Sequence, residues 1–274
     1  MIDNPALSRL GFGVTGPHAG LGQSRRATHM LIREAVGLGM TLFDTGPAYG
    51  RGEGERRLGE ALRGIRRDRV FLSTKAGIHA GGRRDFSAGA VEMSLKASLD
   101  RLRTDHVDLL LLHGPSPEDM SDKLLRRLQA FRERGMIRHI GVCGRGGELD
   151  AAIDAKAFDA IMAPLHPGLD EAALARLDRA KSAGLSVIGI ETMAGTAGGL
   201  RLPLSRGAAW YAARRIKQMM TGRVQPPTDV SPAEALKWAL ARPACNAVIC
   251  LTTRAANLEA NARLAGLEPG RRVS

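Results

Sequence analysis

Eight short runs of apolar, β-prone residues recur along the chain, and segments with helical spacing separate them. Most of these runs are nearly continuous rather than alternating, which is typical of parallel strands buried on both faces under covering helices. The pattern predicts strands at 11–16, 41–46, 70–76, 107–113, 137–143, 160–165, 186–192 and 247–252.

Apolar residues in the intervening segments recur at spacings of three and four, which places them on one face of a helix. They are Met30, Leu31, Ala35 and Leu38, then Leu58, Ala61 and Leu62, then Val91, Leu95, Leu99 and Leu102, then Leu124, Leu125, Leu128 and Phe131. Later helices are expected at roughly 147–155, 170–183, 231–241 and 255–265. Ser231, Pro232 and Glu234 form a strong helix start, and Gly39, Gly64, Gly135 and Gly184 fall where helices should end.

Eight β-then-α units predict a closed (β/α)8 TIM barrel, with residues 1–274 as a single domain. A doubly wound open sheet is the alternative. That fold would carry phosphate-binding glycines after its first strand, but Gly11, Gly13 and Gly16 do not follow the GxGxxG spacing. The barrel is therefore the favoured architecture.

One long segment, residues 194–230, interrupts the alternation after the seventh strand. A long connection in a compact domain is usually functional or mobile. Its middle, residues 208–220, has the composition of an extra helix. Its aromatic pair, Trp210 and Tyr211, could either cover a substrate pocket or pack that helix.

Composition and charge narrow the class of protein. Hydrophobic residues make up 44% and charged residues 25%, the balance of an ordinary globular chain. The net charge of +12 comes from basic residues spread along the sequence without a nucleic-acid-binding module, so we expect no nucleic-acid partner. No HExxH or Cys/His ligand spacing predicts a metal site.

Cysteine usage and apolar runs bear on the compartment. The three cysteines form no CxxC pair and are odd in number, which favours reduced thiols and a cytoplasmic location. The first residues lack the pattern of a secretory signal, and no apolar run approaches the ~18 residues of a membrane span, so we expect neither export nor a membrane partner.

Polar side chains follow the apolar runs of three neighbouring predicted strands. Asp44 ends the second, Lys75 the third and His113 the fourth, and Tyr49 follows Asp44 by five residues. Because all strands of a barrel end at the same mouth, we expect these four side chains to lie together there. Each residue alone could be structural, but as a set they predict a catalytic site.

The motifs around these residues carry a resemblance. FDTGPAYGRGEGERRLGEAL, VFLSTKAG, VDLLLLHGP and GMIRHIGV together resemble the aldo-keto reductase superfamily, most densely between residues 40 and 145. The resemblance implies a nicotinamide-dependent reductase of a small-molecule carbonyl with Asp44, Tyr49, Lys75 and His113 as catalytic tetrad. The hydride must come from a nicotinamide, since no side chain can donate one.

The resemblance also implies the role of each tetrad residue. Tyr49 is the general acid, Lys75 with Asp44 tunes it, and His113 orients the substrate oxygen. A tyrosine has a pKa near ~10, and the nearby Lys75 ammonium is expected to lower it. In the reverse reaction, alcohol oxidation, Tyr49 would act as base.

The cofactor positions depart from the family pattern. Where many members have Ser-Asn after the fifth strand, this chain has Cys143, Gly144 and Arg145. The glutamine and stacking aromatic of the sixth strand correspond to Met162 and Leu165, and the neighbouring His166 is a candidate partial substitute. Cys143 remains a candidate cofactor contact.

The segment VICLTTRAANLEAN resembles the family's site for the 2′-phosphate of NADP. Thr252 and Thr253 are candidate phosphate contacts, Asn261 a candidate adenine contact, and Asn257 stands where NADP-preferring members have an arginine. Arg254 can supply that charge, because arginine favours bidentate phosphate contacts. NADP(H) is therefore expected over NAD(H). Further arginines in the long segment could also reach the phosphate, namely Arg206, Arg214, Arg215 and Arg223.

Two functional hypotheses stay open at this point. The first is an NAD(P)H-dependent carbonyl reductase. The second is a reductase-like barrel in which the altered fifth and sixth strands have weakened or abolished cofactor binding, so that it acts as a binding or regulatory protein. His18 and His79 lie in loops near the expected mouth and are interpreted as loop residues.

Overall fold

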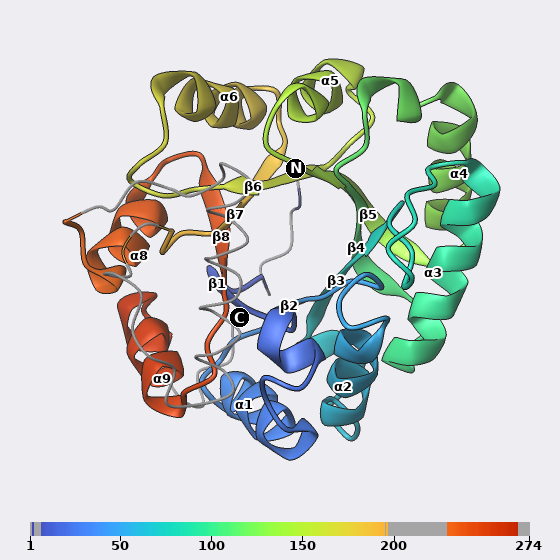
Figure 1. Ribbon diagram of the computed structural model, residues 1–274. Helices are drawn as coiled ribbons and strands as arrows, with labels where there is room; N and C mark the ends of the chain where they lie inside the picture. The colour runs from blue at the N-terminus through green and yellow to red at the C-terminus, as the bar shows by residue number, and fades with distance from the viewer. Residues whose placement is uncertain (1, 3–6, 195, 197–228, 268–274) are drawn as a thin grey trace.

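The computed structural model describes residues 2, 7–194, 196 and 229–267. Parallel strands close into a barrel in chain order, β1 to β8. Figure 1 shows this ring of strands at the centre with the helices around its outside. The predicted (β/α)8 barrel is confirmed.

The strands are β1 (Leu10–Gly13), β2 (Leu42–Asp44), β3 (Phe71–Ala76), β4 (Val107–His113), β5 (Ile137–Cys143), β6 (Ala160–Pro164), β7 (Ser186–Ile190) and β8 (Cys245–Cys250). The α-helices are α1 (Arg25–Gly37), α2 (Glu53–Ala61), α3 (Ala88–Leu102), α4 (Asp122–Glu133), α5 (Gly147–Ala155), α6 (Glu171–Ser182), α8 (Pro232–Ala241) and α9 (Ala255–Leu264). Short 3-10 turns are η1 (Gly16–Ala19), η2 (Arg67–Arg69) and η3 (Pro117–Asp119).

Serine and glycine set many of the helix limits. The Ser231 side chain accepts a hydrogen bond from the Glu234 backbone N–H, and Glu234 bonds back to the Ser231 N–H, so the expected capping box starts α8. All four glycines predicted at helix ends take positive φ, between 71° and 84°, which side chains with a Cβ rarely adopt.

Most predicted strands differ from the observed ones at one end or both. β1 ends at Gly13 rather than at residue 16, and β2 ends at Asp44 rather than at residue 46. β7 stops at Ile190 because Glu191 adopts a positive φ of 57°. β8 begins at Cys245, two residues before the predicted start, because the Asn246 side chain accepts a hydrogen bond from the Val187 backbone N–H and supports the pairing.

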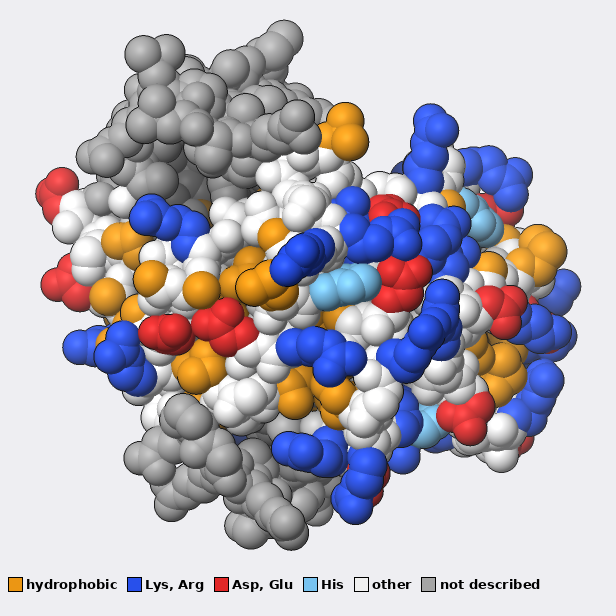
Figure 2. All heavy atoms as spheres, turned by 90° about the horizontal axis from the view of Figure 1, so that it is seen from below, with side chains coloured by type: hydrophobic (Ala, Val, Ile, Leu, Met, Phe, Trp, Pro, Cys, Tyr) orange, Lys and Arg blue, Asp and Glu red, His pale blue; other side chains and the backbone are white. Residues whose placement is uncertain are grey.

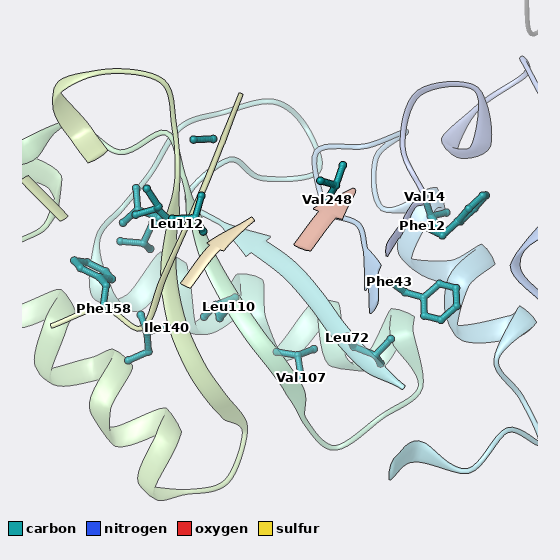
Figure 3. Close-up of a cluster of buried hydrophobic side chains, with 14 of the residues drawn as sticks. Phe12, Val14, Phe43, Leu72, Val107, Leu110, Leu112, Ile140, Phe158 and Val248 are labelled. Atoms are coloured by element: carbon teal, nitrogen blue, oxygen red, sulfur yellow. The ribbon is translucent and has the colours of Figure 1, made fainter. Parts of the chain in front are cut away.

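Side chains of the barrel separate into two apolar layers. The larger lies between strands and helices and includes Phe43, Leu72, Leu110 and Ile140, part of which Figure 3 draws. The smaller fills the barrel interior and contains Leu42, Phe71, Leu109, Leu111, Cys143, Ala160, Met162, Ile188 and Ala247. Alternate residues of each strand enter alternate layers, as the two-residue period of a β-strand requires.

This alternation positions the functional side chains. Two residues after the interior Leu42 comes Asp44, and two after Leu111 comes His113. Phe71, Ser73 and Lys75 follow the same face of β3. The barrel interior therefore ends, at the carboxyl ends of the strands, in polar groups.

The positive charge is distributed over the outer surface. On the face in Figure 2, Lys and Arg side chains cover much of the described surface with Asp and Glu between them. Exposed pairs such as Arg127–Glu92 and Arg179–Asp154 join neighbouring helices. Such pairs contribute little stability individually, about 0–1 kcal/mol.

Candidate active site

A buried ion pair forms the base of the site. The Lys75 Nζ donates to both carboxylate oxygens of Asp44, at 2.6 Å each, and to the Thr45 carbonyl at 2.8 Å. The Ser73 hydroxyl donates to the same carboxylate at 3.0 Å. Lys75 is only 2% exposed, so the ammonium is held in one position with its donors satisfied.

Tyr49 and His113 lie above this pair. The Lys75 Nζ is 5.2 Å from the centroid of the Tyr49 ring, and the Tyr49 and His113 ring centroids are 5.8 Å apart in an edge-to-face arrangement. The structure thus brings together the four residues that the sequence singled out, Asp44, Tyr49, Lys75 and His113.

Burial controls the protonation of these groups. It raises the pKa of Tyr49 to about 12, and the opposing effect of the Lys75 charge is only partial because Asp44 offsets it. Lys75 thus lowers the pKa of Tyr49 as expected from the sequence, but burial outweighs it and the net shift is upward. Burial also disfavours the charged form of Lys75, but the adjacent Asp44 outweighs it, and the pKa of Lys75 is raised.

His113 is neutral near pH 7. Burial first, and then the positive charges of Lys75 and Arg84, lower the pKa of His113 to about 3. Its Nδ1 is buried and has no hydrogen-bond partner within the described residues. A neutral imidazole at this place can donate or accept one hydrogen bond toward the barrel mouth.

The ends of β5 to β7 form the opposite side of the mouth. Cys143 and Met162 belong to the barrel interior, and burial raises the pKa of the Cys143 thiol to about 11. Leu165, by contrast, packs in the outer layer against Gly189, so it does not face the position expected for a stacking aromatic. Ile190 packs against the interior cluster instead.

His166 has an unusual environment. It follows Met162 by four residues, and the Leu165 N–H continues the ladder to the Ile190 carbonyl at 2.9 Å, so the alternation directs His166 to the interior face. It is 1% exposed, and both ring nitrogens lack partners in the described part of the chain, as does the buried Thr192 hydroxyl. Buried polar groups of this kind are costly unless something bonds them.

An ion pair joins the segments that follow β5 and β7. Arg145, after β5, donates to the Glu191 carboxylate, after β7, at 2.6 Å. Burial lowers the pKa of His166, and the charges of Glu191 and Arg145 have smaller, opposing effects on it. At the position of the family's asparagine, a Cβ on Gly144 would lie 2.4 Å from the Glu148 carboxylate, so the Glu148 side chain occupies that space.

The expected phosphate contacts gather where β8 leads into α9. The Thr252 hydroxyl accepts a hydrogen bond from the Arg254 N–H at 3.2 Å, and Arg254 is the exposed N-cap residue of α9. Thr253 is half-buried and Asn257 exposed. Asn261 is buried farther along α9. A helix N-terminus with arginine beside it suits an anion.

His18 supports this segment. Its Nε2 donates to the Thr252 carbonyl at 2.8 Å, and its Nδ1 lies 3.2 Å from the Thr28 hydroxyl. The ring is fully buried, and burial lowers the pKa of His18 to about 4. His18 therefore links the segments after β1 and β8 from a buried position. The sequence indicated a loop residue but did not predict this structural role.

Some expected contributors lie outside the described residues, namely Trp210, Tyr211, Arg206, Arg214, Arg215 and Arg223. His79 lies in the loop after β3, as expected, where its backbone N–H donates to the Arg83 carbonyl at 2.9 Å.

Sequence reasoning missed Ser73, although its place two residues before Lys75 puts it on the same strand face.

Glu55 was also missed. This fully buried carboxylate accepts hydrogen bonds from the Arg101 Nε and the Thr74 hydroxyl, both at 2.6 Å, and so ties α2 to α3 and β3. Its charged neighbours in the sequence make it resemble a solvated helix residue, so no local signal identified it.

Two kinds of feature are absent from the described part of the chain. No cluster of three or more His, Cys, Asp or Glu side chains suited to a metal ion occurs there. None of its helices has the length and apolar character needed to cross a membrane.

Several known proteins resemble this chain in sequence or in fold. L-galactose dehydrogenase of Arabidopsis thaliana is 32% identical over 173 residues, which cover 60% of this chain and 54% of that protein. Methylglyoxal reductase DkgB of Yersinia pestis is 31% identical over 189 residues, which cover 65% of this chain and 67% of that protein. The holo form of aldo-keto reductase AKR11C1 from Bacillus halodurans shares the fold, with a TM-score of 0.75 at 24% identity over 97% of this chain and 89% of that one.

The matches with several curated relatives span only about half of those relatives' own length. A sequence profile described as "Aldo/keto reductase family" matches residues 9–197, which include β1 to β7 and the four residues Asp44, Tyr49, Lys75 and His113. The chain therefore belongs to the aldo/keto reductase family.

Proposed function

We propose that this protein reduces an aldehyde or ketone to an alcohol with a nicotinamide cofactor, and that Tyr49 is the general acid. The observation that carries this proposal is the cluster in which Lys75, bonded to both oxygens of Asp44, lies under Tyr49 beside His113. Family membership supports the same class of reaction.

The protonation states suit reduction. With its pKa raised to about 12, the Tyr49 phenol holds its proton near pH 7, ready for the carbonyl oxygen as negative charge develops there. The Lys75 ammonium stabilises the phenolate that remains, which later recovers a proton from water. Neutral His113 donates a hydrogen bond that orients the carbonyl oxygen.

A bound reduced nicotinamide would supply the hydride that adds to the carbonyl carbon. The residues at the mouth fit such a group. The unpartnered His166 ring and Thr192 hydroxyl offer both donors and acceptors, as a carboxamide requires, although the family's usual polar residues are replaced by Cys143 and Gly144. Met162 and Ile190 supply apolar surface for the ring.

The remainder of the cofactor is assigned to the start of α9. We assign its phosphates to Thr252, Thr253 and the α9 N-terminus, and its adenine to Asn261. Arg254 compensates for the neutral Asn257, and NADP(H) is therefore the proposed cofactor over NAD(H). Cys143 contributes apolar contact rather than a charge, since its thiol stays protonated.

The three cysteines support a reducing compartment such as the cytoplasm. Cys143, Cys245 and Cys250 are free and buried, so none is engaged in a disulfide. The proposed partner is thus a small carbonyl compound that the protein meets inside the cell.

A titration of the purified protein with NADPH and, separately, NADH tests the proposal through nicotinamide fluorescence. A panel of aldehydes and ketones is then followed by the loss of cofactor absorbance. Saturable NADPH binding with turnover supports a reductase. Absence of binding to either nucleotide up to millimolar concentration would instead favour a reductase-like barrel that has lost its cofactor and acts as a binding protein.

A further inference from the structure

The loop after β3 contacts the loop after β4 beside the candidate site. Residues 77–85 fold back as a small hairpin, with an antiparallel bridge between Ile78 and Arg84 and a hydrogen bond from the Asp85 N–H to the Gly77 carbonyl at 2.9 Å. A Cβ on Gly77 would lie 1.9 Å from the Phe86 ring, so the buried ring packs directly on the backbone two residues after Lys75. The hairpin therefore has a defined position beside the mouth.

Arg84 extends from this hairpin toward His113. Its guanidinium carbon lies 5.4 Å from the Phe86 ring centroid, and its Nη2 donates to the carbonyl of Gly114, the residue after His113. Gly114 is in turn fixed by its N–H, which donates to the Cys143 carbonyl at 2.7 Å. The guanidinium thus bridges the loops after β3 and β4, close to the group that orients the substrate.

The charge of Arg84 is not balanced locally. Its neighbour Arg83 pairs with Asp85 at 3.1 Å, and Arg145 across the mouth pairs with Glu191 at 2.6 Å. No carboxylate of the described chain pairs with Arg84, which is exposed and uses one of its five N–H groups on Gly114. The remaining donors can form a charge-assisted contact with an anion.

We propose that Arg84 selects carbonyl substrates that also carry an anionic group, a carboxylate or a phosphate. The carbonyl oxygen lies at Tyr49 and His113 while the anion meets the Arg84 guanidinium. The inference rests on the proposed carbonyl reduction and adds its substrate class. Arg84 is a specificity residue, since it contacts the substrate away from the reacting atoms.

Matched substrate pairs test this selection. 4-Formylbenzoate is compared with its methyl ester, and glyceraldehyde 3-phosphate with glyceraldehyde. The wild-type protein should favour the anionic member of at least one pair about tenfold or more in kcat/KM, mainly through KM, which is the size of one charge-assisted hydrogen bond. The pair with the larger ratio identifies carboxylate or phosphate as the preferred group.

Two variants of adjacent arginines separate charge recognition from structure. Arg84→Gln should reduce the anionic-to-neutral ratio about tenfold, whereas Arg83→Gln, whose side chain already pairs with Asp85, should leave the ratio unchanged. The wild-type ratio should also fall between 50 and 500 mM salt, because exposed charges are screened.

Three outcomes would overturn the inference. The wild type could reduce the neutral members equally well, Arg84→Gln could slow both members of a pair by the same factor, or Arg83→Gln could lower the ratio as much as Arg84→Gln. In each of these cases turnover of neutral aldehydes still supports the proposed function. A protein that binds NADPH but reduces none of the four compounds contradicts both proposals for these substrates.

Discussion

At the residue scale, the Asp44–Lys75 pair is the most constrained feature of the site, because both charges are buried and bonded to each other. Replacing Lys75 by Met leaves the Asp44 carboxylate without its cation. We predict a loss of about 3–5 kcal/mol in the free energy of unfolding, measured by urea denaturation. The double variant Lys75→Met with Asp44→Leu should recover much of this loss. If the single variant were as stable as the wild type, the pair would not be desolvated in solution.

Removal of the Tyr49 hydroxyl should impair catalysis with little effect on stability. Tyr49→Phe keeps the ring beside His113 and removes only the hydroxyl, the proposed proton donor. We expect kcat for carbonyl reduction to fall about 10²- to 10⁴-fold, the usual contribution of a general acid. The NADPH dissociation constant and the unfolding midpoint should change little. Turnover at the wild-type rate would rule out Tyr49 as the acid.

His18 makes a pH-dependent contribution. Its pKa is about 4 in the folded protein and near ~6.5 when unfolded, so the folded state binds fewer protons. The stabilisation is complete above about pH 6.5 and is lost as the pH falls toward 4, by up to about 3 kcal/mol. Urea midpoints of wild type and His18→Gln across this range should converge on acidification. Parallel pH profiles of the two proteins would contradict the assignment.

The sequence predicted that Asp44, Tyr49, Lys75 and His113 lie together because three of them end apolar strands, a signal that needs no knowledge of packing. It could not predict the orientation of Leu165, since one residue of register decides between barrel interior and outer layer. Nor could it place Arg84 beside His113, because that contact joins two loops through a backbone carbonyl. The sign of the Tyr49 pKa shift also depends on burial, which the sequence does not show.

At the element scale, Gly59 sets how closely α2 approaches the end of α3. A Cβ at Gly59 would lie 2.5 Å from the Leu102 carbonyl oxygen, a backbone atom that cannot move aside cheaply. We predict that Gly59→Ala destabilises the protein by about 1–3 kcal/mol despite alanine's higher helix propensity. Gly89→Ala in α3 is the matched control, since nothing lies within 4 Å of its Cβ, and it should be neutral or slightly stabilising. Equal effects of the two substitutions on the urea midpoint would refute the contact.

The positions of the helices and strands were predictable, because burial of one face imposes a regular spacing of apolar residues. The environment of some individual residues within these elements was not predictable. Met30 was assigned to the apolar face of the first helix, yet it is 62% exposed while Leu31 and Ala35 are buried. β8 begins at Cys245, before the apolar run, because the next residue, Asn246, accepts a hydrogen bond from the Val187 backbone N–H of β7. Such exceptions arise from individual contacts, which the spacing of apolar residues does not reveal.

At the scale of the whole molecule, closure of the barrel brings the two halves of the proposed cofactor site together. β1 pairs with β8, and His18 bonds the Thr252 carbonyl across 234 positions of the chain. Binding at the β8–α9 segment and at the mouth therefore requires the closed barrel. A ligand held by both regions should stabilise folding of the whole structure, since it binds the folded state alone.

This coupling predicts a thermal shift that discriminates between cofactors. At 100 times its dissociation constant a ligand adds about 2.7 kcal/mol, enough to raise Tm by several degrees. NADPH should raise Tm more than NADH at equal concentration, because Arg254 at the start of α9 is available to the 2′-phosphate. Arg254→Ala should remove most of the difference, whereas Arg263→Ala, in the last turn of α9, should preserve it. Equal shifts with both nucleotides in the wild type would show that the 2′-phosphate is not recognised, and would transfer the proposed preference to NAD(H).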